Sequence, residues 1–125
     1  MFTLKGLSDE YRLIQTMIHQ SEMNHGEAQF IVWHNLEKCV EVWEDNELCS
    51  YLMILNRDGV RSFHGYKLCK GKVRRLIKVV KDFLKDSGHI YSGYKDGNRN
   101  TGHVLKFLGF HDVASSGTVK VMERI

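Results

Sequence analysis

The sequence predicts a mixed α+β domain, with a mostly antiparallel sheet of about six to seven strands flanked by three to four helices. The chain has 125 residues, 42% hydrophobic and 26% charged, which fits one globular domain over residues 1–125. Strand-like and helix-like patterns follow one another in an order that contains three consecutive strands, which favour antiparallel pairing. A later strand–helix–strand piece allows one parallel crossover.

The start of the chain predicts a short strand followed by a helix. Residues 1–5 can form the strand. Ser8 is a good N-cap, and the acids after it suit the positive end of a helix dipole. The apolar residues at helical spacing are Tyr11, Ile14, Met17 and Ile18. The helix should run to about Met23 and end at Asn24-His25-Gly26.

Three strands are expected in the middle of the chain. Before them, residues 27–37 are ambiguous, because the apolar run from Phe30 to Trp33 fits either a strand or a short buried helix. The strands and their turns, in order, are residues 37–43, the turn Asp45-Asn46, residues 48–55, the turn at 56–59 and residues 60–64. The first two strands form a hairpin.

The second half of the chain carries the clearest element, a helix over residues 70–87. Its apolar side chains fall on one face, and Lys and Arg form a stripe on another. Asn98 or Asn100 can cap another helix that ends near Leu108, where Gly109 stops it. The remaining strands are expected at residues 89–95, 110–114 and 118–123.

The net charge of +3 is distributed unevenly between the two halves of the chain. Residues 1–62 carry five Lys and Arg against ten Asp and Glu, a net −5, and residues 63–125 carry thirteen against five, a net +8. The second half therefore binds an anion (nucleic acid, phosphate or an acidic partner), or the two halves attract each other within one fold. Four cations lie in Lys70-Gly71-Lys72-Val73-Arg74-Arg75, at the predicted helix start. A turn with glycine before a helix N-terminus commonly holds phosphate, because the first N–H groups there are unpaired.

A second motif lies in the predicted helix that follows the next strand. This helix begins at Asn98 and ends at the motif Leu108-Gly109-Phe110. Together with the order of elements, this spacing resembles the GCN5-related N-acetyltransferase (GNAT) superfamily over nearly the whole chain. The resemblance implies a three-layer α/β/α GNAT-like fold, acetyl-CoA as co-substrate, and transfer of an acetyl group to a primary amine of a protein or small molecule.

The family's coenzyme loop reads Gln/Arg-x-x-Gly-x-Gly/Ala immediately before the helix. The aligned segment here runs from Leu68 to Val73, keeps Gly71 and departs from the pattern at its first and last positions. The resemblance implies that the coenzyme contacts are Leu68, Lys70, Gly71, Lys72, Val73, Arg74, Arg75 and Asn98. In its basic loop the chain is most similar to divergent phage-encoded GNAT-like proteins of the internal virion protein type.

The resemblance also indicates where the reaction would be catalysed. The family takes a base from the strand before the loop, and His64 ends that strand here; an unperturbed imidazole pKa near 6.5 would suit a base at neutral pH. The family's acid is often a Tyr on the last helix, but this chain has Leu105 there. His103, two residues away, should face a different side of the helix.

Other readings of the sequence stay open. The chain could be a catalytically degenerate GNAT-like phage protein with a structural role in the virion or a role in binding a host protein, which exposed Trp33 and Trp43 would favour. The basic stripe could bind nucleic acid, although Asp82 and Asp86 interrupt it. Cys69 could be a reactive thiol beside a helix N-terminus. No Cys or His pair has metal-ligand spacing, no apolar stretch is long enough to cross a bilayer, and no signal peptide is evident, so we expect a cytoplasmic protein (host cytoplasm or virion if phage-encoded) without metal or membrane partner.

Overall fold

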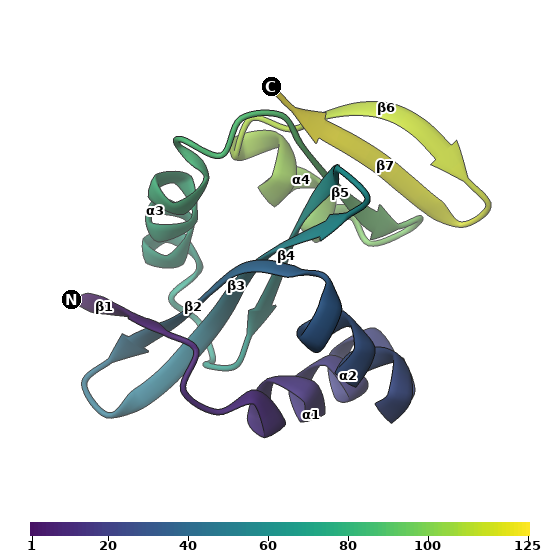
Figure 1. Ribbon diagram of the computed structural model, residues 1–125. Helices are drawn as coiled ribbons and strands as arrows, with labels where there is room; N and C mark the ends of the chain where they lie inside the picture. The colour runs from purple at the N-terminus through teal and green to yellow at the C-terminus, as the bar shows by residue number, and fades with distance from the viewer. The chain divides into compact units, whose positions relative to one another are not determined.

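The computed structural model describes residues 1–125 and confirms the predicted fold class, a seven-stranded mixed sheet with four helices (Figure 1). In chain order the elements are β1 (Phe2–Gly6), α1 (Glu10–Ser21), α2 (His25–His34), β2 (Leu36–Glu44), β3 (Glu47–Arg57), β4 (Val60–Lys67), α3 (Val73–Leu84), β5 (Ile90–Lys95), α4 (Arg99–Phe107), β6 (His111–Ser116) and β7 (Val119–Arg124). None of the helices combines the length and hydropathy needed to cross a bilayer.

The strands are hydrogen-bonded in the order β1-β2-β3-β4-β5-β7-β6. Antiparallel pairing joins β1 to β2, β2 to β3, β5 to β7 and β6 to β7. The β4–β5 pair is parallel, with Ser62 opposite Tyr91, so α3 is the crossover of a β–α–β unit. This is the one parallel crossover that the sequence predicts.

The chain divides into two compact units. The first contains Met1–Gly59 and His64–Gly71, and the second contains Val60–Phe63 and Lys72–Ile125. The boundary therefore falls inside β4, whose first four residues belong to the second unit and whose remainder belongs to the first.

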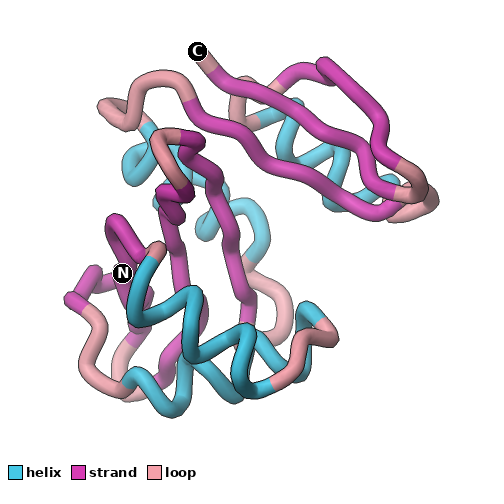
Figure 2. The backbone as a smooth tube through the Cα atoms, turned by 45° about the vertical axis from the view of Figure 1, so that its right-hand side comes forward, coloured by secondary structure: helices cyan, strands magenta, loops and turns pink.

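In the first unit, α1 and α2 pack on strands of the sheet (Figure 2). The shared core consists of Leu13, Ile14, Met17, Ala28, Ile31, Val32, Leu48, Tyr51, Met53, Leu55 and Tyr66. Of the ambiguous residues 27–37, those up to His34 belong to helix α2 and those from Leu36 belong to β2. The helix buries Ala28, Ile31 and Val32 and leaves Phe30 and Trp33 exposed. It is helical because Asn24 caps it, with its side chain accepting a hydrogen bond from the Glu27 amide at 2.8 Å.

The predicted N-cap of α1 is wrong by one residue. Asp9 caps the helix, and its carboxylate accepts from the Arg12 amide at 3.1 Å. Ser8 instead donates to the Glu41 carboxylate on β2 from its amide at 2.9 Å and from its hydroxyl at 2.9 Å and 3.1 Å. Glu41 is 1% exposed and accepts a further hydrogen bond from Trp43 Nε1 at 3.0 Å. Burial raises the pKa of Glu41, but these donors and the Arg12 charge outweigh it, so the net shift is downward.

In the second unit, aromatic rings and one arginine connect the elements. Phe63 contacts the rings of Phe83 and Phe110, with centroid distances of 6.2 Å and 6.4 Å. Arg124 on β7 donates to the carbonyl oxygens of Leu108 and Leu84, both at 3.0 Å, and so satisfies acceptors at the ends of α4 and α3.

The amphipathic helix is shorter than predicted, because α3 spans Val73–Leu84 rather than residues 70–87. Residues 70 and 71 belong to the preceding turn, and the turn after the helix begins at Lys85. Between the two possible caps of α4, the structure has Asn98.

Candidate functional site

The turn that leads from β4 toward α3 is anchored to a neighbouring strand by its own backbone. The amides of Leu68 and Cys69 both donate to the carbonyl oxygen of Cys49 on β3, at 2.8 Å and 3.3 Å. The Cys69 side chain is 8% exposed, a position that suits packing better than a reactive thiol. Leu68 occupies the first position of the predicted coenzyme loop and is exposed to solvent.

Two consecutive residues of this turn have left-handed backbone conformations. Gly71 has φ of 67° and Lys72 has φ of 63°. Glycine adopts this region at little cost, whereas a lysine there is uncommon. Apart from Gly71 and its two chain neighbours, nothing lies within 4 Å of the place where a Cβ of Gly71 would stand, so the backbone is open to a ligand on that side.

The N-terminus of α3 differs from those of the other helices. Its N-cap residue, Lys72, makes no side-chain capping bond, and its first turn contains no acidic residue. By contrast, α1, α2 and α4 are capped by the side chains of Asp9, Asn24 and Asn98. The amides of Val73, Arg74 and Arg75 precede the first intrahelical hydrogen bond, which joins the Leu76 amide to the Lys72 carbonyl at 2.9 Å. These three donors and the helix dipole suit an anion.

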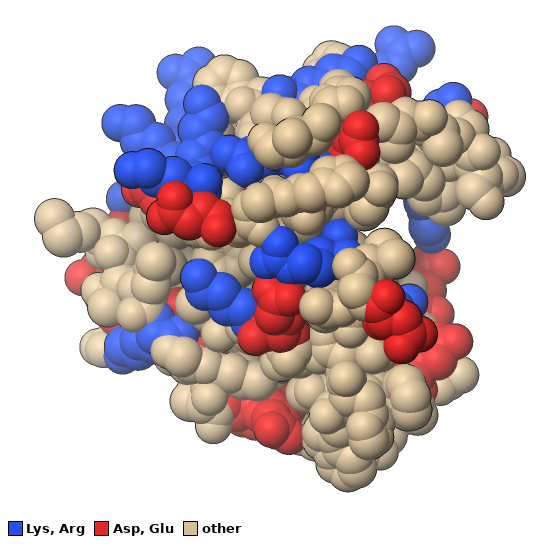
Figure 3. All heavy atoms as spheres, turned by 45° about the horizontal axis from the view of Figure 1, so that its top comes forward, with Lys and Arg blue, Asp and Glu red and all other residues tan.

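Positive charge surrounds this helix start. Lys70, Arg74 and Arg75 are exposed, and Val73, the first helical residue, is 46% exposed. The second unit carries twelve Lys and Arg against five Asp and Glu, a net charge of +7. On the face drawn in Figure 3, basic side chains gather at the upper left, with a few acidic ones among them.

His64, the predicted base, lies on the part of β4 that belongs to the first unit. It is half-buried, and burial together with the positive charge of Arg57 lowers its pKa to about 4. The expectation of an imidazole with a pKa near 6.5 is therefore corrected, and His64 is neutral at pH 7.

Asn98 and Leu105, the two α4 positions that the family resemblance identifies, have structural roles here. The Asn98 side chain caps the helix by accepting from the Thr101 amide at 3.3 Å. Leu105, at the position of the family's Tyr, is 5% exposed. His103 is exposed and lies on another face of the helix, as its spacing from Leu105 predicts.

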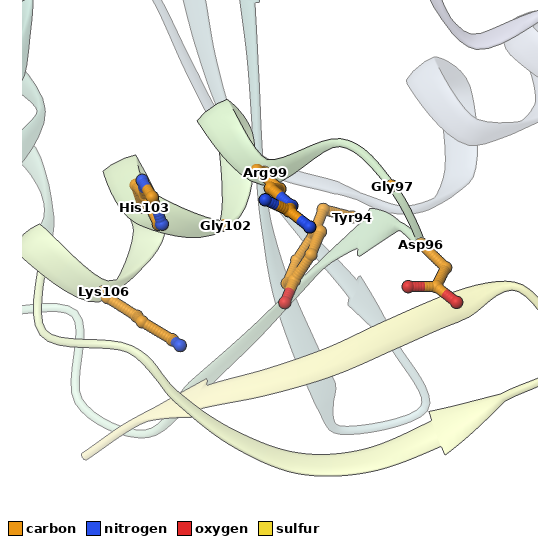
Figure 4. A pocket seen from close by; sticks show the side chains of 7 residues that line it. All are labelled: Tyr94, Asp96, Gly97, Arg99, Gly102, His103 and Lys106. Atoms are coloured by element: carbon orange, nitrogen blue, oxygen red, sulfur yellow. The ribbon is translucent and has the colours of Figure 1, made fainter.

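A pocket of about 440 Å³ opens beside α4 within the second unit (Figure 4). It is lined by Tyr94, Asp96, Gly97, Arg99, Gly102, His103 and Lys106. Sequence reasoning missed this pocket. The available signal was the spacing of Arg99, His103 and Lys106, which are four and three residues apart and so share one helix face.

The seven-stranded sheet with its parallel β4–α3–β5 crossover has the same fold as solved N-acetyltransferases, one of them of the GNAT family. No protein-family profile matches the chain, and no curated protein matches its sequence. Solved structures match almost its full length. The ribosomal-protein-S18-alanine N-acetyltransferase of Escherichia coli has a TM-score of 0.70 at 10% identity, over 99% of this chain and 93% of that chain. A GNAT-family acetyltransferase of Bacillus cereus has a TM-score of 0.69 at 14% identity, over 100% and 99%. The PaiA N-acetyltransferase of Thermoplasma acidophilum, solved in complex with coenzyme A, has a TM-score of 0.67 at 13% identity, over 99% and 98%.

Proposed function

We propose that the protein is an acetyl-CoA-dependent N-acetyltransferase that acts on a primary amine of a protein or small molecule. The observation that carries this proposal is the start of α3. It combines an open Gly71 backbone, a first turn without a capping side chain and a run of exposed cations. In a GNAT fold this is where a coenzyme pyrophosphate is expected, and the properties of the site suit that group.

The pyrophosphate would accept hydrogen bonds from the amides of Val73, Arg74 and Arg75. The side chains of Lys70, Lys72, Arg74 and Arg75 would add charge. Arg is suited to this task because its planar guanidinium donates to two phosphate oxygens at once. Val73 is compatible with pyrophosphate binding because it is the first residue of the helix. Its side chain is exposed to solvent and does not occupy the space beside the Gly71 backbone.

The reaction forms a bond between the amine nitrogen and the acetyl carbon and breaks the carbon–sulfur bond of the thioester. The amine must give up a proton and the leaving thiolate must receive one. His64 is the proposed acceptor, and its pKa of about 4 keeps it unprotonated at neutral pH but makes it a weak base. Leu105 has no proton to give, so water would protonate the thiolate. Such chemistry predicts a slow enzyme.

Because acetyl-CoA is a cytoplasmic metabolite, we propose that the protein acts in the cytoplasm. If the protein is phage-encoded, this is the cytoplasm of the host cell.

One observation favours a second candidate, a catalytically degenerate phage protein that keeps the fold to bind a virion or host protein. Trp33 is 59% exposed, and its indole Nε1 donates to Glu10 on α1 at 3.1 Å. Exposed tryptophans are enriched where proteins bind one another. Trp43, by contrast, is half-buried beneath the Lys5 ammonium, which lies 5.1 Å from the centroid of its ring.

Ligand-dependent thermal stability separates the two candidates. Acetyl-CoA or CoA at 100 times its Kd should stabilise the fold by about 2.7 kcal/mol and raise Tm accordingly. The variant Arg74→Ala/Arg75→Ala should lose this shift. The matched control Lys78→Ala/Lys85→Ala removes the same charge from the middle of α3 and from the turn that follows it, and should keep the shift.

No shift with either ligand would contradict the enzyme proposal and leave the binding-protein candidate. Equal loss in the two double variants would mean that only overall charge matters, as expected for nucleic acid. In that case a steep dependence of DNA affinity on salt should be measurable. Where the shift is present, release of free thiol from acetyl-CoA in the presence of an amine tests turnover.

A further inference from the structure

The pocket beside α4 has no role in the proposed acetyl transfer. Its residues come from the end of β5, from the turn that follows and from one face of α4, all within the second unit. None of them belongs to the coenzyme contacts proposed at the start of α3. Its volume of about 440 Å³ lies in the range of small-molecule sites.

Hydrogen-bond donors predominate among the side chains of this pocket. Arg99, His103 and Lys106 project from α4 toward the side on which the Tyr94 hydroxyl lies (Figure 4). Arg and Lys donate and do not accept, and a tyrosine hydroxyl donates readily to an anion. Asp96 is the one carboxylate that lines the pocket. The unit's net charge of +7 adds a long-range attraction for anions.

The position of Tyr94 depends on Gly102. A Cβ at Gly102 would stand 2.9 Å from Tyr94 Cζ and 3.2 Å from its hydroxyl oxygen, too close for any larger residue. The ring therefore lies directly against the backbone of α4. This contact fixes the Tyr94 hydroxyl on the helix, at the same pocket as Arg99 and Lys106.

We propose that this pocket binds the phosphate monoester group of a small hydroxylated molecule. A phosphoryl group has three terminal oxygens, which suit the forked donors of Arg99 and the single donors of Tyr94 and Lys106. A carboxylate has only two oxygens for these donors. A bare phosphate ion would leave much of the pocket empty, and Asp96 provides an acceptor for a ligand hydroxyl.

One existing interaction competes with the ligand. Lys106 Nζ lies 3.6 Å from a carboxylate oxygen of Asp112 on β6, in an ion pair about half exposed to solvent. An exposed pair of this kind contributes little, so a phosphoryl group can replace it. Removing Asp112 should therefore strengthen ligand binding, whereas removing Arg99 should weaken it.

The test is a titration of the amide NMR spectrum with inorganic phosphate, glucose 6-phosphate and glucose. Glucose 6-phosphate should shift amides of residues 96–106 and bind more tightly than inorganic phosphate, and glucose should not bind. Arg99→Gln should weaken binding about tenfold, since charge-assisted hydrogen bonds are lost. Asp112→Asn should tighten it about threefold. Lys85→Gln, which removes an exposed charge outside the pocket, should change nothing.

Three results would overturn the proposal. One is the absence of shifts at residues 96–106 with glucose 6-phosphate. Another is equal weakening by Arg99→Gln and Lys85→Gln, which would indicate a general charge effect. The third is loss of the shifts when CoA is bound, which would make the pocket part of the coenzyme site. If CoA does not bind at all, the pocket proposal is unaffected, because it rests on different residues.

Discussion

The environment of His64 makes the stability of the fold depend on pH. Its pKa falls from 6.5 to about 4 because burial and the Arg57 charge disfavour the imidazolium form. In the unfolded chain the same imidazole would titrate near its ordinary value, so between these two values the unfolded state binds more protons. The stability contributed by the neutral imidazole is complete above pH 6.5 and is lost as the pH falls toward 4.

The size of this effect follows from the shift. One pKa unit corresponds to 1.36 kcal/mol, so the full difference is at most about 3 kcal/mol, and about 2 kcal/mol is lost by pH 5. His64 is only half-buried, and water near the ring would reduce both values. Even so, 2 kcal/mol is a large part of the 5–15 kcal/mol that is typical of whole domains.

The assay is urea unfolding at closely spaced pH values for the wild type and for His64→Gln, which cannot titrate. The difference in unfolding free energy between the two proteins should change by up to about 2 kcal/mol from pH 7 to pH 5, with the wild type losing more. Parallel curves would refute the reasoning, as would an NMR titration that places the His64 pKa near 6.5. If the variant is too unstable, that NMR titration of the wild type alone decides the matter.

Three further substitutions test contacts described above by urea unfolding. Gly102→Ala should destabilise by about 1 kcal/mol, because the clash with Tyr94 exceeds the gain in helix propensity, and in a Tyr94→Ala background the same change should stabilise; destabilisation in both backgrounds would contradict the contact. Glu41→Gln should cost about 2 kcal/mol at pH 7, because three donors from Ser8 and Trp43 lose their ionised acceptor. Since the Glu41 pKa is lowered, the difference from wild type should shrink as the pH falls below 4.5, and a constant difference would argue against an ionised Glu41. Asn98→Ala should cost about 1 kcal/mol through loss of the α4 cap, and no loss would mean that this capping bond is not formed.

Local patterns were sufficient for most of the elements. The helix α3 was visible because its apolar residues share one face, and Gly109 marked the end of α4. Helix α2 was ambiguous because its apolar residues are not confined to one face, with Phe30 exposed next to the buried Ile31. The Ser8 error has a tertiary cause. Its hydroxyl is used by Glu41, 33 residues away, and no local signal shows this.

The candidate sites also differ in how far the sequence alone could predict them. The turn around Gly71 could be predicted, since glycine, basic residues and a helix start are consecutive in the sequence. The pKa of His64 could not, because it depends on burial and on Arg57. The α4 pocket also requires the fold, which brings Tyr94 on β5 against Gly102 on α4.

The division of β4 between the two units has a consequence for synthesis of the chain. Ser62 emerges from the ribosome before the last residues of the first unit, yet its strand partner Tyr91 comes 29 residues later. The first unit can therefore complete its strands while the beginning of β4 is still an unpaired edge, the kind of surface on which nascent chains associate. No single cut of the polypeptide separates the units, so a fragment ending at Gly71 would retain that open edge permanently.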